Sequence, residues 1–172
     1  MMKKKERVEI IKGDITGLEV DAIVNAANNS LLGGGGVDGA IHRAAGPELY
    51  KECEGLKGCE TGKAKITQGY KLRAKHVIHT VGPIWHGGYR NEHETLASCY
   101  QATLDLAKKH KLKTVAFPGI STGVYGFPKD LAALIAVNES KRFLMKNSFP
   151  EKVIFVAFDE ESYEIYNKLL DQ

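Results

Sequence analysis

The sequence is poor in the features that mark membrane, secreted or nucleic-acid-binding proteins. No apolar run approaches the length of a membrane span, and the basic start of the chain runs into Glu6 and Arg7 instead of the apolar core of a secretory signal. The formal net charge of +3 is too small to indicate nucleic acid as the main partner. We therefore expect no membrane partner, and nucleic-acid binding is a weak hypothesis.

Cysteine is also scarce. Cys53, Cys59 and Cys99 are the three cysteines, and reduced thiols in a cytoplasmic protein are the default expectation. Cys53 and Cys59 lack the paired spacing of a zinc site. His76 and His79 lie three apart on an expected strand, so they point to opposite faces and cannot chelate one ion. The sequence therefore predicts no metal site.

The length suits one domain. A chain of 172 residues can bury a good core without disulfides or metals. We see no internal repeat and no linker. We expect residues 1–172 to form a single domain that acts as a monomer, with residues 1–5 as a disordered basic tail.

Apolar strands alternate with helical segments along the chain. We expect strands at residues 7–12, 22–25, 63–68, 76–81, 114–117 and 152–158. We expect helices at residues 38–45, 93–110, 128–145 and, capped by Asp159, 160–170. Pro47 either follows the end of the first helix or restarts it. Because several strands lack a polar face, the pattern favours a three-layer α/β/α sandwich on a largely parallel sheet.

The segment at residues 93–110 gives the clearest helical signal. Its apolar side chains recur at helical spacing and predict one buried stripe. The stripe consists of Leu96, Cys99, Tyr100, Thr103, Leu104 and Ala107.

The stretch Asp21–Gly46 joins a strand, a polar loop and the start of a helix. The loop passes through four consecutive glycines, Gly33–Gly36. Glycine lets backbone N–H groups approach a bulky anion, and a helix N-terminus favours phosphate. A flexible linker is the weaker alternative, because both flanking segments are apolar. Ligands of open α/β sheets bind at the carboxyl ends of the strands. There the loops at residues 13–17, 25–36, 119–127 and 158–161 could converge.

Two nucleotide-binding motifs match only in part. Residues 34–39 fit G-x-G-x-x-G, but an Asn-rich loop separates them from the strand, and no acidic residue closes the next strand. Residues 62–64 read Gly-Lys-Ala, so the hydroxyl that a Walker loop places on magnesium is missing.

Residues 119–123 fit the G-x-S-x-G elbow of serine hydrolases. That elbow needs a helix directly after the serine and a histidine later in the chain, and Ser121 has neither. We expect Ser121 to hold phosphate through its hydroxyl and N–H groups instead of acting as a nucleophile.

Two glycine-rich loops with few fixed positive charges suggest a diphosphate held by backbone N–H groups. Asp38 is then either the N-cap of its helix or an acceptor for ribose hydroxyls. Asn28 both donates and accepts, so it could grip a vicinal diol together with Asp38, while Asn25 braces the loop. Asp14 is a turn residue or an acceptor for an exocyclic amino group. His42 is expected to be a packed or capping side chain.

These residues resemble the macrodomain family and, within it, the MacroD-type ADP-ribose hydrolases. The resemblance covers nearly the whole chain. It implies an α/β/α sandwich on a mixed sheet, with ADP-ribose as ligand and no separate cofactor. The matching segments are GDIT at 13–16, VNAAN at 24–28, GGGGVDGAIHRAAG at 33–46, HTVGPIW at 79–85 and FPGISTGVYGFP at 117–128.

The resemblance also implies roles for individual residues. Asp14, the Ile15 backbone and Phe158 would contact adenine. Asn28 and Asp38 match the pair that holds the distal ribose and supports hydrolysis. Tyr125 would also cover that ribose. The residues that would wrap the diphosphate are Gly34, Gly35, Gly36, Val37, Ser121, Thr122, Gly123, Val124 and Tyr125.

The implied activity is hydrolysis of ADP-ribose esters. The substrates would be proteins with mono-ADP-ribose on acidic side chains, and O-acetyl-ADP-ribose, through metal-free attack of water at the distal ribose. A lone carboxylate without a nearby histidine base suits a labile ester better than an N-glycosidic bond. The alternative is a non-catalytic ADP-ribose reader. Phosphatase activity on ADP-ribose 1″-phosphate and RNA-end binding are weaker hypotheses.

Overall fold

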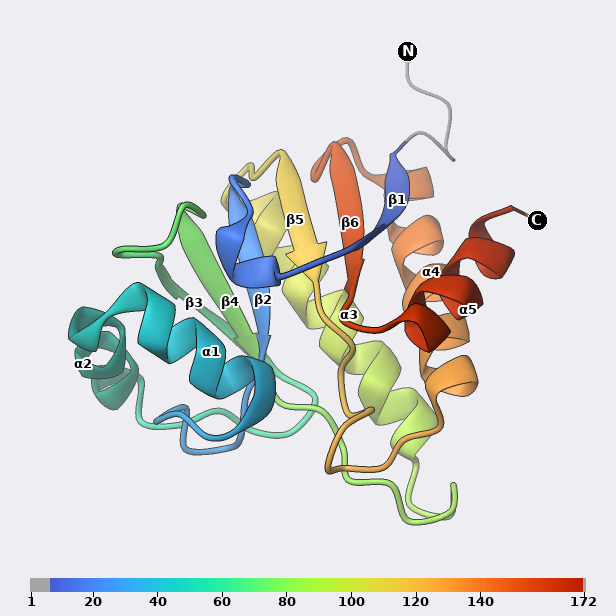
Figure 1. Ribbon diagram of the computed structural model, residues 1–172, viewed down its shortest axis with the longest axis horizontal. Coiled ribbons are helices and arrows are strands. Elements are labelled where there is room, and N and C mark those ends of the chain that lie inside the picture. The colour runs from blue at the N-terminus through green and yellow to red at the C-terminus, as the bar shows by residue number, and fades with distance from the viewer. Residues whose placement is uncertain (1–6, 172) are drawn as a thin grey trace.

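The computed structural model describes residues 7–171, which form one six-stranded sheet with five α-helices on its two faces (Figure 1). The expected tail at residues 1–5 lies outside the described residues. The strands are β1 (Val8–Lys12), β2 (Ala22–Ala26), β3 (Ala64–Gln68), β4 (His76–Thr80), β5 (Thr114–Phe117) and β6 (Lys152–Ala157). The helices are η2 (Ile15–Gly17, a 3-10 helix), α1 (Gly36–Ala45), α2 (Pro47–Leu56), α3 (Glu92–Lys109), α4 (Lys129–Lys146) and α5 (Glu160–Leu170).

The strands lie in the order β1-β6-β5-β2-β4-β3. Every neighbouring pair from β1 to β4 is parallel, and β3 runs antiparallel to β4. The predicted α/β/α sandwich on a mixed, largely parallel sheet is confirmed. The carboxyl ends of the parallel strands therefore share one edge, and the loops that leave them share the same end of the molecule.

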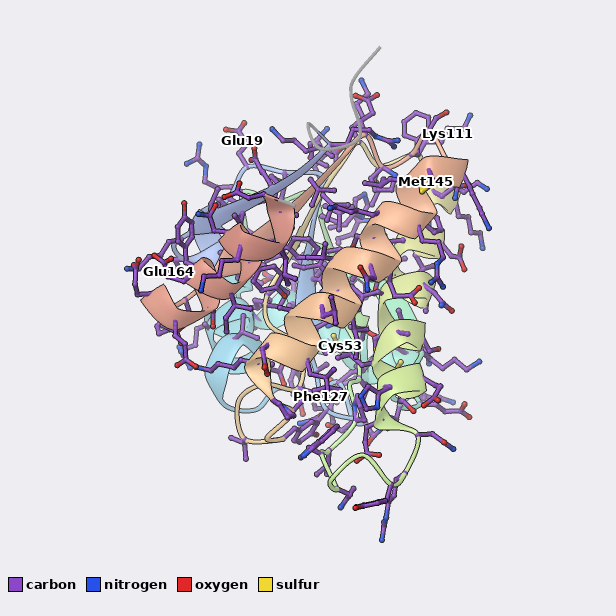
Figure 2. The ribbon with its side chains drawn as sticks, turned by 90° about the vertical axis from the view of Figure 1, so that its right-hand side faces the viewer. Glu19, Cys53, Lys111, Phe127, Met145 and Glu164 are labelled. Atoms are coloured by element: carbon purple, nitrogen blue, oxygen red, sulfur yellow. The ribbon has the colours of Figure 1, made fainter. Side chains whose placement is uncertain are left out.

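The alternation of side chains along each strand divides the core into two halves. Ala22 and Val24 of β2 pack in the cluster that includes α3, α4 and α5 residues, whereas Ile23 packs in the cluster under α1 and α2. Figure 2 shows α3, α4 and α5 side by side on one side of the molecule. The same alternation turns Asn25 toward the layer formed by α1 and α2.

Most element boundaries agree with the sequence within one or two residues. All six residues of the predicted α3 stripe are buried. Asp159 caps α5 as predicted, because its carboxylate accepts a hydrogen bond from the Ser162 amide at 2.8 Å. Pro47 restarts the helix, since Gly46 breaks it with a φ of 89° and α2 begins at Pro47. No helix within residues 7–171 is long and apolar enough to cross a membrane.

The glycine loop after β2 rests directly on α1. A Cβ at Gly39 would lie 2.5 Å from the Gly34 carbonyl oxygen and 3.0 Å from Arg43 Nη1. No side chain fits at the first of these distances, so glycine at position 39 lets the loop approach the helix.

Gly39→Ala should lower the free energy of unfolding by about 1–3 kcal/mol, because the added methyl group pushes the loop away from α1. Helix propensity alone favours the opposite sign, since alanine exceeds glycine by about 1 kcal/mol in a helix. Gly55→Ala in α2 is the matched control, because nothing beyond the adjacent residues and backbone of its own helix lies within 4 Å of its Cβ position. Urea unfolding of both variants measures the difference. A higher free energy of unfolding in both would show that the loop does not rest on Gly39.

Arg7 ties the start of β1 to the far end of α4. The last carbonyls of a helix have no partner within the helix, and one guanidinium can satisfy several of them. Arg7 donates to the carbonyl oxygens of Leu144 (2.8 Å), Asn147 (3.0 Å), Ser148 (3.3 Å), Pro150 (2.7 Å) and Glu151 (3.1 Å).

Arg7→Lys should therefore lower the free energy of unfolding by about 2 kcal/mol, because an ammonium group cannot span this set of acceptors. Arg142→Lys, on the exposed surface of α4, should change it by less than about 0.5 kcal/mol. Both values come from chemical denaturation, and equal losses in the two variants would contradict the special role of Arg7.

Candidate active site

Three loops at the carboxyl edge of the sheet meet around a hollow. They follow β2, β4 and β5. The Trp85 amide donates to the Tyr125 carbonyl at 2.8 Å, which joins the β4 and β5 loops. A hollow of about 250 Å³ is lined by Asn29 of the β2 loop, Gly82 of the β4 loop and Tyr125 of the β5 loop, among others. The predicted convergence of the loops at residues 25–36 and 119–127 is therefore confirmed.

Asp38 is the chemically most unusual residue of this region. Its side chain is buried, with 4% of the residue exposed, in the first turn of α1. Oδ1 accepts a hydrogen bond from Asn25 Nδ2 at 2.9 Å and lies 3.5 Å from His42 Nε2. Among residues 7–171, no lysine or arginine forms an ion pair with it. A buried carboxylate without a lysine or arginine partner is costly, and such groups are concentrated at functional sites.

The pKa of the Asp38 carboxyl reflects this setting. Burial raises the pKa above its ordinary value, and the hydrogen bond from Asn25 and the proximity of His42 only partly oppose the rise. The alternative that Asp38 caps α1 is wrong, because Gly35 occupies the N-cap position and no side chain caps this helix. The first amides of α1 therefore face the loop without a side-chain partner.

Asn28 shapes the glycine loop. Its Nδ2 donates to the Gly33 carbonyl at 2.9 Å, and its Oδ1 accepts from the amide and hydroxyl of Ser30 at 3.2 and 2.7 Å. A Cβ at Gly34 would lie 3.4 Å from Asn28 Nδ2 and 3.1 Å from Asp38 Oδ2. Asn28 and Asp38 thus border Gly34 together, while the direct partner of Asp38 is Asn25.

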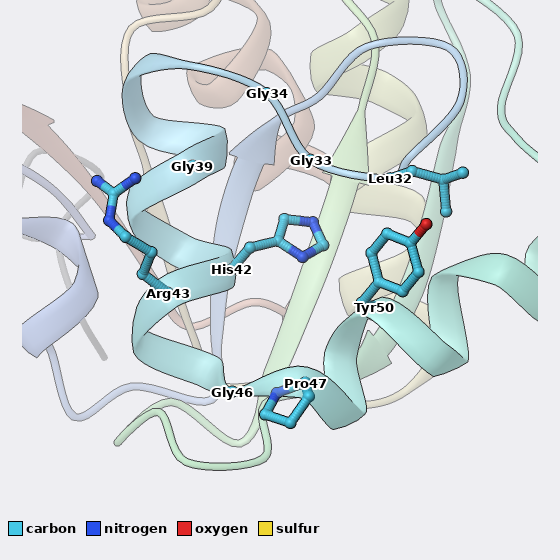
Figure 3. A pocket seen from close by; sticks show the side chains of 9 residues that line it. All are labelled: Leu32, Gly33, Gly34, Gly39, His42, Arg43, Gly46, Pro47 and Tyr50. Carbon is cyan, nitrogen blue, oxygen red and sulfur yellow. The ribbon is translucent and has the colours of Figure 1, made fainter.

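Sequence reasoning expected His42 to be a packed or capping side chain and missed that it lies beside Asp38. The inference that no histidine lies near the carboxylate was wrong, because Asp38 and His42 are one helical turn apart on α1. Spacing of i, i+4 places two side chains on the same helix face, and this signal could have found the pair. Figure 3 shows His42 pointing from α1 into a hollow of about 460 Å³, toward Tyr50 of α2. His42 therefore lies between Asp38 and that hollow.

The residues expected to contact adenine follow the carboxyl ends of β1 and β6. Asp14 is exposed and caps η2, since Oδ1 accepts from the Thr16 amide at 2.9 Å and the Thr16 hydroxyl at 2.7 Å. These bonds lower the pKa of Asp14. The bond from the Gly13 amide to the Ala157 carbonyl places the ends of β1 and β6 together, so Asp14 and the exposed Phe158 follow neighbouring strand ends. Ile15 is buried in the core below α1.

The loop after β5 folds back on itself and packs against the β4 loop. Ser121 has a φ of 65° and is buried against Gly82, where a Cβ would lie 2.2 Å from Ser121 Oγ. Its carbonyl accepts from the Phe127 amide at 2.9 Å. Because α4 begins only at Lys129, the helix of a nucleophile elbow is absent from this position. Thr122 and Tyr125 are half-buried in this loop, and Gly123 and Val124 are exposed.

Metal ligands do not gather in the described part of the chain. No group of three or more His, Cys, Asp or Glu side chains within residues 7–171 is arranged to hold a metal ion. The cysteines Cys53, Cys59 and Cys99 are all free and buried.

Comparisons with known proteins agree with this architecture. The Macro domain family model matches residues 24–136. A Macro domain-containing protein of Methanosarcina mazei is 59% identical over 97% of this chain and 89% of its own length. The O-acetyl-ADP-ribose deacetylase of Escherichia fergusonii is 52% identical over 98% of this chain and 97% of its own length.

Two further matches concern ADP-ribose. The ADP-ribose glycohydrolase MACROD2 of Homo sapiens is 57% identical over 97% of this chain, which spans 40% of that protein. The solved structure of a Trypanosoma brucei macrodomain in complex with ADP-ribose is 44% identical and covers 95% of this chain and 69% of that one, with a TM-score of 0.90. The resemblance seen in the sequence is confirmed, and this chain belongs to the macro domain family.

Proposed function

We propose that this chain is a hydrolase of ADP-ribose esters, which removes mono-ADP-ribose from acidic side chains of proteins and deacetylates O-acetyl-ADP-ribose. The deacetylase of Escherichia fergusonii supports this proposal, because the match covers nearly the full length of both chains. MACROD2 supports it within the part that the two proteins share.

The observation that carries the proposal is the buried carboxylate of Asp38. A protein that only bound ADP-ribose could satisfy ribose hydroxyls with neutral side chains and would avoid the cost of burying a charge. Burial raises the pKa of Asp38, and a raised pKa makes a carboxylate a better base at neutral pH. This favours hydrolysis over the alternative of a non-catalytic reader.

In the proposed complex, ADP-ribose lies along the carboxyl edge of the sheet. The adenine lies near Asp14, the Ile15 backbone and Phe158. The diphosphate lies between the β2 and β5 loops, facing the uncapped amides of α1, and needs no metal ion. The distal ribose lies beside Asn28 and Asp38, under Tyr125. The residues proposed around the diphosphate are Gly34, Gly35, Gly36, Val37, Ser121, Thr122, Gly123, Val124 and Tyr125.

The proposed reaction consumes one water molecule per ester. For a modified acidic side chain, the water oxygen bonds to the anomeric carbon of the distal ribose, and the carbon–oxygen bond to the ester breaks. The bonding electrons leave with the carboxylate, and Asp38 accepts a proton from the water. A carboxylate without a nearby histidine was the reason to expect ester substrates over N-glycosidic ones. That reason does not hold, because His42 Nε2 lies 3.5 Å from Asp38 Oδ1. The similarity to the deacetylase of Escherichia fergusonii supports ester substrates instead.

Asp38→Asn tests the proposal. We expect kcat for a peptide that carries ADP-ribose on glutamate to fall by about 10²–10⁴, because the amide cannot accept a proton. The dissociation constant for ADP-ribose should stay within about tenfold, and thermal stability should hold or rise, because a buried charge is removed. Turnover of the unmodified protein should survive a chelator.

Asp105→Asn, on the exposed face of α3, is the matched control and should change neither quantity. Calorimetry and release of free ADP-ribose are measured on the same samples. Micromolar binding with no release by the unmodified protein would make it a reader, and loss of release with chelator would overturn the metal-free mechanism.

Asp14 tests the adenine end separately. Asp14→Asn keeps the oxygen that caps η2 but replaces the other oxygen with a donor, which cannot accept from an adenine amino group. We expect weaker ADP-ribose binding by about tenfold with kcat little changed, because adenine is remote from the reacting bond. Asp14→Ala should weaken binding similarly and also destabilise the cap by about 1 kcal/mol. Unchanged affinity in both variants would place the adenine elsewhere.

A further inference from the structure

A row of buried polar side chains leads from Asp38 into the interior of the protein. Asn25 of β2 and His79 of β4 are register partners in adjacent parallel strands, and both are 0% exposed. Asn25 Nδ2 lies 2.9 Å from Asp38 Oδ1 and 3.1 Å from His79 Nδ1. On the far side of the ring, His79 Nε2 lies 3.0 Å from Thr67 Oγ1 of β3. The row therefore crosses three strands and ends at the carboxylate.

The directions of these hydrogen bonds are set from the Thr67 end. The Thr67 hydroxyl has one proton. Thr67 Oγ1 lies 3.1 Å from the Gln68 carbonyl oxygen, which can only accept, so the hydroxyl donates its proton there. The hydroxyl oxygen is then free to accept from His79 Nε2–H. With the proton on Nε2, Nδ1 of the neutral ring is an acceptor. It accepts one hydrogen of the Asn25 amide, and the other hydrogen goes to Asp38.

The unsatisfied oxygen of Asn25 shows that its partners hold the amide in one orientation. Asn25 Oδ1 is buried and has no hydrogen-bond partner among the described residues. Leaving a buried acceptor unpaired costs about 1–3 kcal/mol. The opposite orientation is worse, because it turns Oδ1 toward two acceptors, the Asp38 carboxylate and His79 Nδ1. That orientation becomes favourable only when Asp38 and Nδ1 of His79 are protonated.

The ring of His79 is held neutral by its surroundings. Burial lowers the pKa of His79 to about 3, with a smaller contribution from His42. The Cys53 thiol, 3.9 Å from Nε2, is the remaining polar neighbour of the ring among the described residues. His79 thus keeps its acceptor nitrogen throughout the physiological pH range.

We propose that His79 is a positioning residue for the hydrolysis proposed above, which accepts one hydrogen of the Asn25 amide and so directs the other to Asp38. This inference rests on the proposed function for its catalytic consequence. His79 touches no substrate. It acts through Asn25 by keeping Asp38 ionised and fixed in the rotamer that faces Gly34.

The variants His79→Asn and His79→Leu form a matched pair. The two replacement side chains have nearly the same size, and each leaves the same space where Nε2 was. Asn offers an oxygen near the position of Nδ1, whereas Leu offers no acceptor. We expect kcat to fall about 10- to 100-fold in His79→Leu and by much less in His79→Asn, with KM little changed in both. Equal losses of kcat in the two variants would overturn the proposal.

The pH profile of kcat separates positioning from a merely structural role. The hydrogen bond from Asn25 lowers the pKa of Asp38, so its loss raises that pKa and moves the acid limb of the profile to higher pH. We expect a shift of about one unit in His79→Leu and none in His79→Asn. The other titratable and charged groups around the row are unchanged in both variants, so they cancel in the comparison. They are His42, Arg43, Glu52 and Cys53.

Nuclear magnetic resonance of the unmodified protein tests the geometry without any variant. Between pH 5 and 8, the ring nitrogens of His79 should report a neutral ring with the proton on Nε2. A scalar coupling across the hydrogen bond should connect Asn25 Nδ2 to His79 Nδ1. A proton on Nδ1, or a titrating ring, overturns the proposal even if both variants fail to fold. If the unmodified protein releases no ADP-ribose, the proposed function fails. These resonances still show whether His79 Nδ1 accepts a hydrogen bond from the Asn25 amide.

Discussion

The hydrogen bond from Asn25 to Asp38 is the constraint on which the rest of the site depends. It joins the end of β2 to the first turn of α1, and it gives a carboxylate that is 4% exposed its direct hydrogen-bond donor within the described chain. Without that donor, burial would drive the carboxyl toward its protonated form. The parallel pairing of β2 with β4 supports this hydrogen bond, because it places His79 beside Asn25.

Glycines of the β2 loop and of α1 make this arrangement sterically possible. Gly39 lets the Gly34 carbonyl rest on α1, and Gly34 in turn has no side chain to strike Asp38 Oδ2 or Asn28 Nδ2. The helix consequently begins at Gly36 with no side-chain cap, and its first amides are left for a ligand. Glycine at these positions therefore permits the close packing of the carboxylate and leaves the first turn of the same helix without a side-chain cap.

The sequence predicts the fold and the chemistry of single residues better than it predicts their partners. The stripe of α3 and the apolar strands were correct, because periodicity is a local property of the chain. The cap at Asp159 was also local. Asp38 was ambiguous, since a shift of two residues in the start of α1 turns an N-cap into a first-turn residue. The contact between Asn25 and His79 was out of reach, because it depends on the register of two strands that are far apart in the sequence.

The neutrality of Asn25, the direct donor to Asp38, has a chemical reason. A lysine or arginine in place of Asn25 would lower the pKa of the carboxyl strongly, and the carboxylate would then be a poor base. With no donor, the buried carboxyl would hold its proton and could accept none. An amide fixed by a neutral imidazole lies between these limits, since it favours the ionised form through one hydrogen bond and adds no charge beside the proposed diphosphate. The buried row from Thr67 to Asp38 therefore sets the basicity of the site as well as its shape.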